Sequence, residues 1–71
     1  MISQFDIDLG SALRKVREQK GFTQIEIAER LGMTKMAISS WESGKRSMTA
    51  YNLKRYCKIL GVSVQSIIDQ T

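Results

Sequence analysis

The 71-residue sequence contains no proline and no histidine, and its single cysteine is Cys57. One cysteine excludes a disulfide within the chain and any metal site built from several cysteines. The sequence also lacks a glycine-rich phosphate loop, a metal-ligand cluster and a nucleophile beside a base, so we expect no enzyme activity, no cofactor, no metal and no small-molecule ligand. No apolar run approaches the roughly 18 residues that cross a membrane, so we expect no membrane partner.

Length and composition indicate one small folded domain. A chain of 71 residues, 42% of them hydrophobic, has room for a single thin core. We therefore expect one domain over residues 1–71, with residues 1–7 as a possible flexible arm. The first ten residues contain neither a basic segment nor a continuous apolar segment, which argues against a signal peptide and favours a cytoplasmic protein.

Positive charge is concentrated in the middle of the chain. Residues 1–33 contain five Lys or Arg and five Asp or Glu, a net charge of zero. Residues 34–58 contain six Lys or Arg against Glu42 alone, a net charge of +5, and the remaining residues contain only Asp69. This asymmetry fits a polyanionic partner, although a merely solvated basic surface explains the charge equally well.

Threonine and serine residues with apolar neighbours predict four helix starts. Each is a plausible N-cap that follows an apolar residue and precedes another by four positions, the pattern of a hydrophobic staple. The caps are Thr23, Thr34, Thr49 and Ser63, and glycines able to end helices stand at positions 21, 32, 44 and 61. Together they predict an all-α fold with helices at about 8–20, 24–31, 35–43, 50–60 and 64–70, the first capped by Asp6 or Asp8.

The segment from Gln24 to Glu42 has the spacing of a helix-turn-helix. Ala28 is small enough to let two helices cross closely, Gly32 permits a tight turn, and Ile38 can pin the second helix to the first. In such a motif the second helix lies in the major groove of DNA and presents its N-terminal end to base edges. The segment therefore predicts a DNA-reading helix over residues 35–43.

Three stretches carry a resemblance to a known family. They are LRKVREQKGFTQIEIAERLGMT, AISSWESGKR and LKRYCKILGVS, and the similarity extends from Leu9 to about Ile68. The chain resembles the Cro/CI-type (XRE-like) helix-turn-helix family of phage and bacterial repressors, which implies a five-helix lambda-repressor-like domain with the motif on helices two and three. Family members often carry a proline after the segment written here as GKRS. Its absence leaves the conformation of residues 45–49 open.

The resemblance implies which residues contact double-stranded DNA. Lys35 can donate to guanine or to a phosphate, Met36 can meet a thymine methyl group, and Gln24 would bond to a phosphate where the first motif helix starts. The loop after the reading helix and the next helix start suit the sugar-phosphate backbone. The predicted DNA-binding residues are Gln24, Thr34, Lys35, Met36, Ser39, Ser40, Lys45, Arg46 and Asn52. The alternative for each of them is an ordinary solvated position.

Arg17 and Glu42 are predicted to form a structural ion pair. In the resembling family an arginine near the end of the first helix pairs with a glutamate near the end of the third. A forked bond between the two would hold the reading helix against the first helix. The alternative is two unrelated surface charges.

The last predicted helix carries three aliphatic residues, Val64, Ile67 and Ile68, which we expect to contribute to a dimer interface. A homodimer, formed in solution or only on DNA, would place two reading helices about 34 Å apart on a palindromic site. The alternative is that these residues only seal the core of the monomer.

The sequence favours a sequence-specific transcriptional regulator, a dimeric repressor of bacterial or phage origin that occludes a promoter. The alternative is a protein-interaction module, such as the antitoxin-like subunit of a toxin–antitoxin pair. An exposed Met36 and Ile25, and only one charged base-facing residue, Lys35, would suit that alternative. Salt separates the two, because binding through several phosphates weakens steeply as the salt concentration rises.

Overall fold

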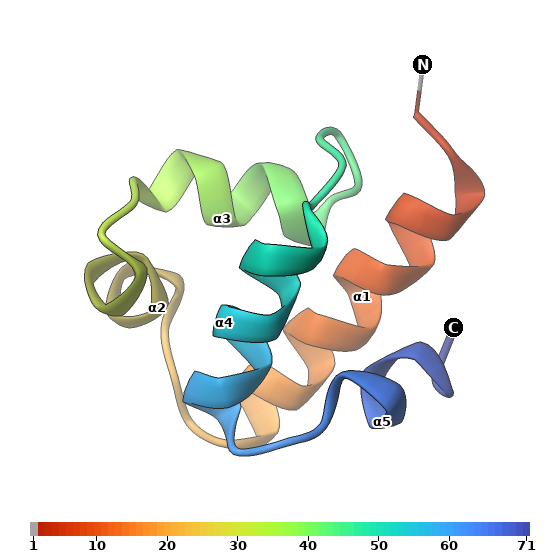
Figure 1. The fold of residues 1–71 in the computed structure, drawn as a ribbon. Helices are drawn as coiled ribbons and strands as arrows, with labels where there is room; N and C mark the ends of the chain where they lie inside the picture. The colour runs from red at the N-terminus through yellow and green to blue at the C-terminus, as the bar shows by residue number, and fades with distance from the viewer. Residues whose placement is uncertain (1) are drawn as a thin grey trace.

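The computed structural model describes residues 2–71, which form five helices and no strand (Figure 1). The helices are α1 (Gln4–Gln19), α2 (Gln24–Leu31), α3 (Lys35–Glu42), α4 (Ala50–Leu60) and α5 (Val64–Ile68). The predicted all-α fold is confirmed, and the bounds of α2 to α5 agree with the predicted ranges to within two residues. The start of α1 is the exception.

α1 begins four residues earlier than predicted, at Gln4. Its N-cap is Ser3, whose Oγ accepts the backbone N–H of Asp6 at 3.1 Å, so the prediction of Asp6 or Asp8 as the cap is wrong. Asp6 instead lies in the first turn, where a carboxylate interacts favourably with the positive end of the helix dipole. Residues 4–7 of the expected flexible arm are therefore helical, whereas Met1 lies outside the described residues.

The other four helix starts follow the predicted capping pattern. Each cap side chain accepts the backbone N–H three residues later: Thr23 from Glu26, Thr34 from Ala37, Thr49 from Asn52 and Ser63 from Ser66. The apolar residue before each cap packs against the core, as a staple requires: Phe22, Met33, Met48 and Val62. The local capping pattern therefore predicts correctly where these four helices begin.

Every helix contributes one side chain that is 0% exposed. These residues are Leu13, Ile27, Ile38, Tyr56 and Ile67, in helix order. Burying a large apolar side chain contributes about 1.5–3 kcal/mol, so this shared centre stabilises the arrangement of all five helices. α1 contacts α3, α4 and α5, while α2 packs against α3 and α4 (Figure 1).

α1 and α3 cross closely at Gly10. A Cβ atom at this position would overlap the carbonyl oxygen of Trp41 and would lie 2.7 Å from that of Glu42. Because both obstacles are backbone atoms, a larger residue would have to push the two helices apart. Gly10 therefore fixes the distance between α1 and the C-terminal end of α3.

Candidate nucleic-acid interface

α3 separates a buried face from an exposed one. Its buried residues are Ala37, Ile38, Trp41 and Glu42. Lys35, Met36 and Ser39 are exposed, and Met36 is 77% exposed, the largest fraction among the exposed large hydrophobic residues. Thr34, also exposed, caps the helix. The helix therefore presents four of the predicted base-facing residues to solvent.

The exposed face of α3 borders an open hollow of about 410 Å³ that is shared with α2. Lys35, Met36 and Ser39 line it together with Gln24. Among residues 2–71, no carboxylate lies within ion-pair distance of Lys35. The ammonium group of Lys35 is therefore available to an external partner.

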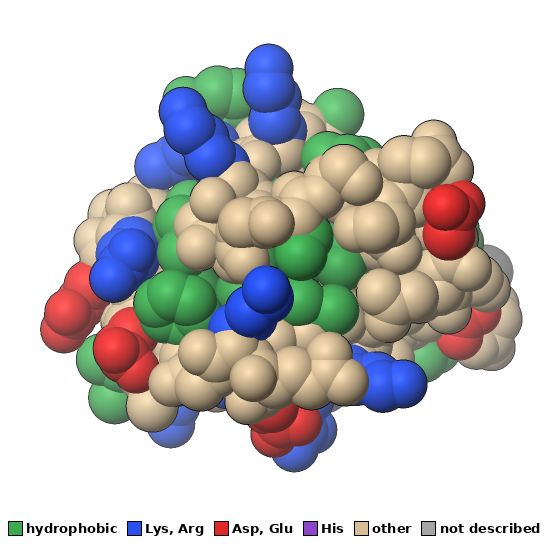
Figure 2. Space-filling model, turned by 90° about the horizontal axis from the view of Figure 1, so that it is seen from below, with side chains coloured by type: hydrophobic (Ala, Val, Ile, Leu, Met, Phe, Trp, Pro, Cys, Tyr) green, Lys and Arg blue, Asp and Glu red, His purple; other side chains and the backbone are tan. Residues whose placement is uncertain are grey.

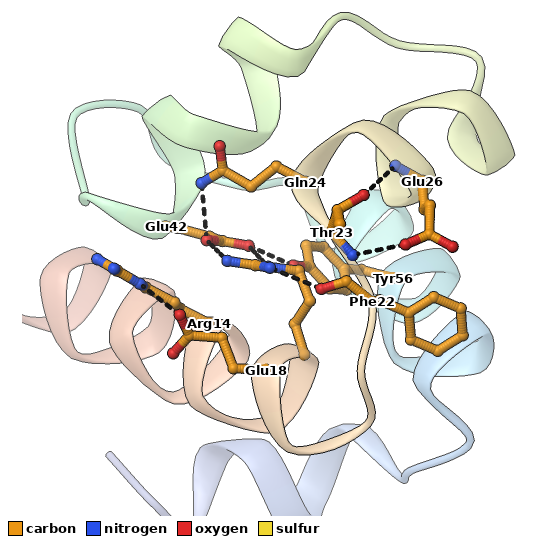
Figure 3. A network of polar contacts seen from close by, with 9 residues as sticks. Arg14, Glu18, Phe22, Thr23, Gln24, Glu26, Glu42 and Tyr56 are labelled. Atoms are coloured by element: carbon orange, nitrogen blue, oxygen red, sulfur yellow. Dashed lines mark hydrogen bonds and ion pairs between the residues drawn. The ribbon is translucent and has the colours of Figure 1, made fainter.

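Gln24 has an internal partner that the sequence did not reveal. Its side chain is half-buried, and its Nε2 donates to Glu42 Oε1 at 3.0 Å (Figure 3). A side-chain amide carries two N–H groups, so one of them remains for an acceptor outside the protein. The backbone N–H groups of Gln24 and Ile25, in the first turn of α2, have no protein acceptor among the described residues. Such unpaired groups at a helix N-terminus favour an anion.

The predicted ion pair between Arg17 and Glu42 is present and almost completely buried. Arg17 Nε donates to Glu42 Oε2 at 2.7 Å and Arg17 Nη2 donates to Oε1 at 3.0 Å. A third arginine nitrogen, Nη1, donates to the carbonyl of Phe22 at 2.7 Å, and Tyr56 donates its hydroxyl to Glu42 Oε2 at 2.5 Å. With Gln24, Glu42 thus accepts bonds from α1, α2 and α4 (Figure 3).

These bonds determine the ionisation of the network. Burial alone would raise the pKa of Glu42, but the hydrogen bonds from Arg17, Tyr56 and Gln24 outweigh it, so its pKa lies below the ordinary value. Burial and the bond to Glu42 raise the pKa of Tyr56, and the bond to Glu42 raises the pKa of Arg17. The network therefore holds a carboxylate, a guanidinium and a neutral phenol. No buried side-chain polar atom among the described residues lacks a partner. Removing either Arg17 or Glu42 would therefore leave the other buried charge uncompensated.

Sequence reasoning missed Tyr56 as a member of this network. The only available signal was its place on the predicted buried face of residues 50–60, because a buried tyrosine hydroxyl needs an acceptor. Which acceptor it finds depends on how α4 packs against α3, and no local pattern encodes that packing.

The α3–α4 loop is attached to the first turn of α1. The exposed Lys45 and Arg46 donate their backbone N–H groups to the carbonyl of Ser40 at 2.9 and 3.3 Å. Ser47 Oγ donates to Asp6 Oδ2 at 2.7 Å. This bond, followed by the one from Ser3, lowers the pKa of Asp6. The loop conformation that the missing proline left open is thus held by hydrogen bonds.

Two further predicted DNA-binding residues are half-buried, as Gln24 is. Ser40 is half-buried on α3. Asn52 is half-buried in the first turn of α4, and its Oδ1 accepts a long 3.5 Å bond from Arg55 Nη1. Ser40 follows the exposed Ser39, but neither side chain is freely solvated.

The three aliphatic residues of α5 differ in exposure. Ile67 is fully buried in the core of the monomer, so the prediction that it belongs to a dimer interface needs correction: its side chain has no surface to offer a partner. Val64 is partly buried against the core, and Ile68 is 36% exposed. Within residues 2–71, no helix has the length and apolar character to span a membrane, and no group of three His, Cys, Asp or Glu could hold a metal ion.

A helix-turn-helix family model matches residues 13–67, and the chain belongs to the XRE-type (Cro/CI-type) helix-turn-helix family. An HTH-type transcriptional regulator of Sinorhizobium fredii is 35% identical over 63 residues, which cover 89% of this chain and 82% of the relative. Other relatives are longer, and the chain spans 31% and 57% of two of them.

Solved structures share the fold. The clp gene regulator ClgR of Corynebacterium glutamicum superposes with a TM-score of 0.91 at 31% identity, covering 96% of this chain and 88% of that one. SinR, a master regulator of biofilm formation solved in complex with DNA, superposes with a TM-score of 0.78 at 29% identity. The match covers 86% of this chain and 98% of the SinR chain. The chain is a transcriptional regulator with a helix-turn-helix DNA-binding domain, and these relatives give no support to the antitoxin-like alternative.

Proposed function

We propose that the protein is a repressor that binds a palindromic DNA operator as a homodimer and occludes a promoter. The observation that carries the proposal is the two-faced α3, whose exposed face has no internal partner for Lys35 and whose buried face is held by Glu42. A helix fixed in this way offers side chains to base edges with little further ordering.

Specificity would come from the exposed face of α3. Lys35 would donate to guanine O6 or N7, and Met36 would contact a thymine methyl group. Thr34, Ser39 and Ser40 would contribute short polar contacts, some of them through water. One charged residue and one apolar residue can distinguish few base pairs directly, so the sequence-dependent shape of the DNA would contribute to specificity as well.

Backbone contacts would flank the reading helix on both sides. At one side, Gln24 would use its remaining side-chain N–H and the N-terminus of α2 to hold a phosphate. At the other, Lys45 and Arg46 would contact the DNA backbone from the α3–α4 loop, and Asn52 would contact it from the first turn of α4. Several phosphate contacts make the affinity depend steeply on salt.

The dimer would use the exposed part of α5, Ile68, with Val64 beside it. This surface is small, which supports a dimer that forms mainly on DNA. Two copies would place their reading helices about one helical turn of DNA apart, about 34 Å.

Selection from a pool of random duplexes, followed by sedimentation of the recovered complex, tests the proposal. We expect one palindromic site, two copies of the chain per duplex, and an affinity that falls steeply with added salt. The protein should reduce expression of a reporter gene whose promoter overlaps this site. Recovery of no enriched sequence, or of a site that binds a single copy, would contradict the proposal.

A further inference from the structure

A second surface of the molecule combines positive charge with an apolar floor. The C-terminal parts of α2 and α4 border an open groove of about 340 Å³ lined by Arg30, Leu31, Arg55, Lys58 and Ile59. We call it the α2–α4 groove. In the view from below, Lys and Arg side chains lie next to hydrophobic atoms on the side of α2, with Asp and Glu side chains close by (Figure 2). None of the residues that line the hollow beside α3 belongs to this groove.

Contacts within the chain position both guanidinium groups of the groove. Arg55 Nη2 donates to the carbonyl of Leu31 at 2.8 Å, at the C-terminal end of α2, where a cation is favoured. Its guanidinium carbon also lies 5.3 Å from the centre of the Tyr51 ring. The guanidinium carbon of Arg30 lies 5.0 Å from the centre of the Phe22 ring. Because these side chains are already ordered, an anionic partner would lose less conformational entropy on binding them.

No carboxylate of the described residues forms an ion pair with a cation of the groove. Glu26 stands four residues before Arg30, the spacing of an ion pair on a helix, but its carboxylate accepts the backbone N–H of Thr23 at 2.9 Å and attracts Arg30 only from beyond ion-pair distance. The ion pairs within residues 2–71 involve neither arginine of the groove, nor Lys58. Arg30, Arg55 and Lys58 therefore remain positive around an apolar floor formed by Leu31 and Ile59.

The groove stays accessible when α3 is engaged. α4 starts beside the α3–α4 loop and runs to the opposite end of the molecule, where it connects to α5 (Figure 1). Lys58 and Ile59 lie in its last turn. A second DNA duplex would require only positive charge on the protein surface. An apolar floor between cations instead fits a ligand that has both carboxylates and a hydrophobic side chain.

We propose that the α2–α4 groove binds an acidic peptide segment of a partner protein. Carboxylates of the segment would bond to Arg30, Arg55 and Lys58, and one leucine-like or phenylalanine-like side chain would rest on Leu31 and Ile59. Arg55 connects the two helices of this site, because its Nη2 donates from α4 to the carbonyl of Leu31 on α2. A regulator bound to DNA through α3 would in this way recruit a second protein.

A synthetic peptide with Asp and Glu residues flanking a single leucine tests the proposal. The full chain is titrated with the peptide while its backbone amide signals are followed by NMR, with and without a bound duplex. We expect saturable shifts confined to the C-terminal turns of α2 and α4, unchanged by the duplex. Lys58→Glu and Arg30→Gln are each expected to weaken binding, the charge reversal by about tenfold or more.

Lys15→Glu is the matched control, since it makes the same charge change on an exposed residue of α1 and should leave peptide affinity within about twofold. A peptide with Asn and Gln in place of Asp and Glu should not bind. Shifts spread over the whole surface, or equal losses in the control variant, would overturn the proposal in favour of a nonspecific charge effect. If Lys58→Glu weakens duplex binding as much as Lys45→Glu does, the groove belongs to the DNA surface and the proposal is wrong.

Discussion

The two faces of α3 differ in how much the protein itself constrains them. On the buried face, Glu42 accepts hydrogen bonds from three other helices, and Ile38 is completely enclosed. On the exposed face, Lys35 and Met36 have no protein partner that fixes them. The contrast shows that the buried face can fix the position of a helix while residues on its exposed face can be substituted without loss of packing. Stability and base recognition should therefore respond to different mutations.

The largest effect should come from the buried face. Replacing Glu42 with alanine leaves the guanidinium of Arg17 buried without its partner, and breaking one side of a buried pair costs about 3–5 kcal/mol. Chemical denaturation of Glu42→Ala should show this loss of unfolding free energy, and duplex binding should fall with it. A free energy of unfolding equal to that of the wild type would separate the network from the stability of the fold.

The ion pair between Arg14 and Glu18 is the matched control for that variant. It lies one turn away from Arg17 on α1, its nitrogen–oxygen distance is 3.6 Å, and both side chains are more than half exposed. Exposed pairs contribute about 0–1 kcal/mol, so Arg14→Ala should leave the unfolding free energy almost unchanged. Equal losses in Arg14→Ala and Glu42→Ala would remove the distinction between buried and exposed pairs.

The exposed face should show the opposite behaviour. Lys35→Ala should weaken binding of the selected duplex by about 1–3 kcal/mol, the energy of a good contact between a side chain and a base. The midpoint of thermal unfolding should stay at the wild-type value, because Lys35 contacts nothing in the core. Fluorescence anisotropy and calorimetry measure the two quantities on the same samples. A lower unfolding midpoint would show that the two faces are not independent.

Acid should weaken the buried face without any mutation. The pKa of Glu42 is lowered in the folded protein from an ordinary 4.5, so the unfolded chain takes up the proton more readily. The stability contributed by the ionised Glu42 is thus complete above about pH 4.5 and is lost as the pH falls through the folded pKa. Urea denaturation across this range should give a steeper decline for the wild type than for Glu42→Gln. Parallel profiles would show that another carboxylate, such as Asp6, causes the decline.

The smallest effect should come from the loop that carries Lys45 and Arg46. Ser47→Ala removes an exposed hydrogen bond to Asp6, and such surface changes alter free energies little, so duplex affinity should fall by no more than about two- to threefold. Amide hydrogen exchange should nevertheless become faster at Lys45 and Arg46. Unchanged exchange in this variant would mean that the bonds to Ser40 hold the loop alone.

Local rules predicted most of the fold. Thr23, Thr34, Thr49 and Ser63 determine four helix starts because a cap and its staple lie within a few residues of each other. The first predicted start was wrong because Ser3, Asp6 and Asp8 are all good caps. The longer helix is accompanied by contacts with the distant α3–α4 loop, Ile7 with Gly44 and Asp6 with Ser47. The position of Gly10 against Trp41 was equally invisible, since it depends on how two distant helices cross.

In the candidate site, too, some residues were predictable from the sequence and others were not. The exposure of Lys35 and Met36 follows from helical periodicity, and the pair between Arg17 and Glu42 follows from the family resemblance. Tyr56 and the inward bond of Gln24 depend on the tertiary arrangement of four helices, so the sequence alone did not identify them. Ile67 shows the reverse error: an apolar residue on a short terminal helix fits a dimer interface and a core equally well until its burial is known.

The most direct test of the account is a selection from random duplexes performed in parallel with the wild type and Lys35→Ala. If the outer face of α3 reads bases while the inner face only holds the helix, both proteins will select palindromic sites of the same spacing. The variant will then lose its preference at one symmetric pair of positions only. Identical base preferences for the two proteins, with Lys35 absent from one of them, would contradict the account.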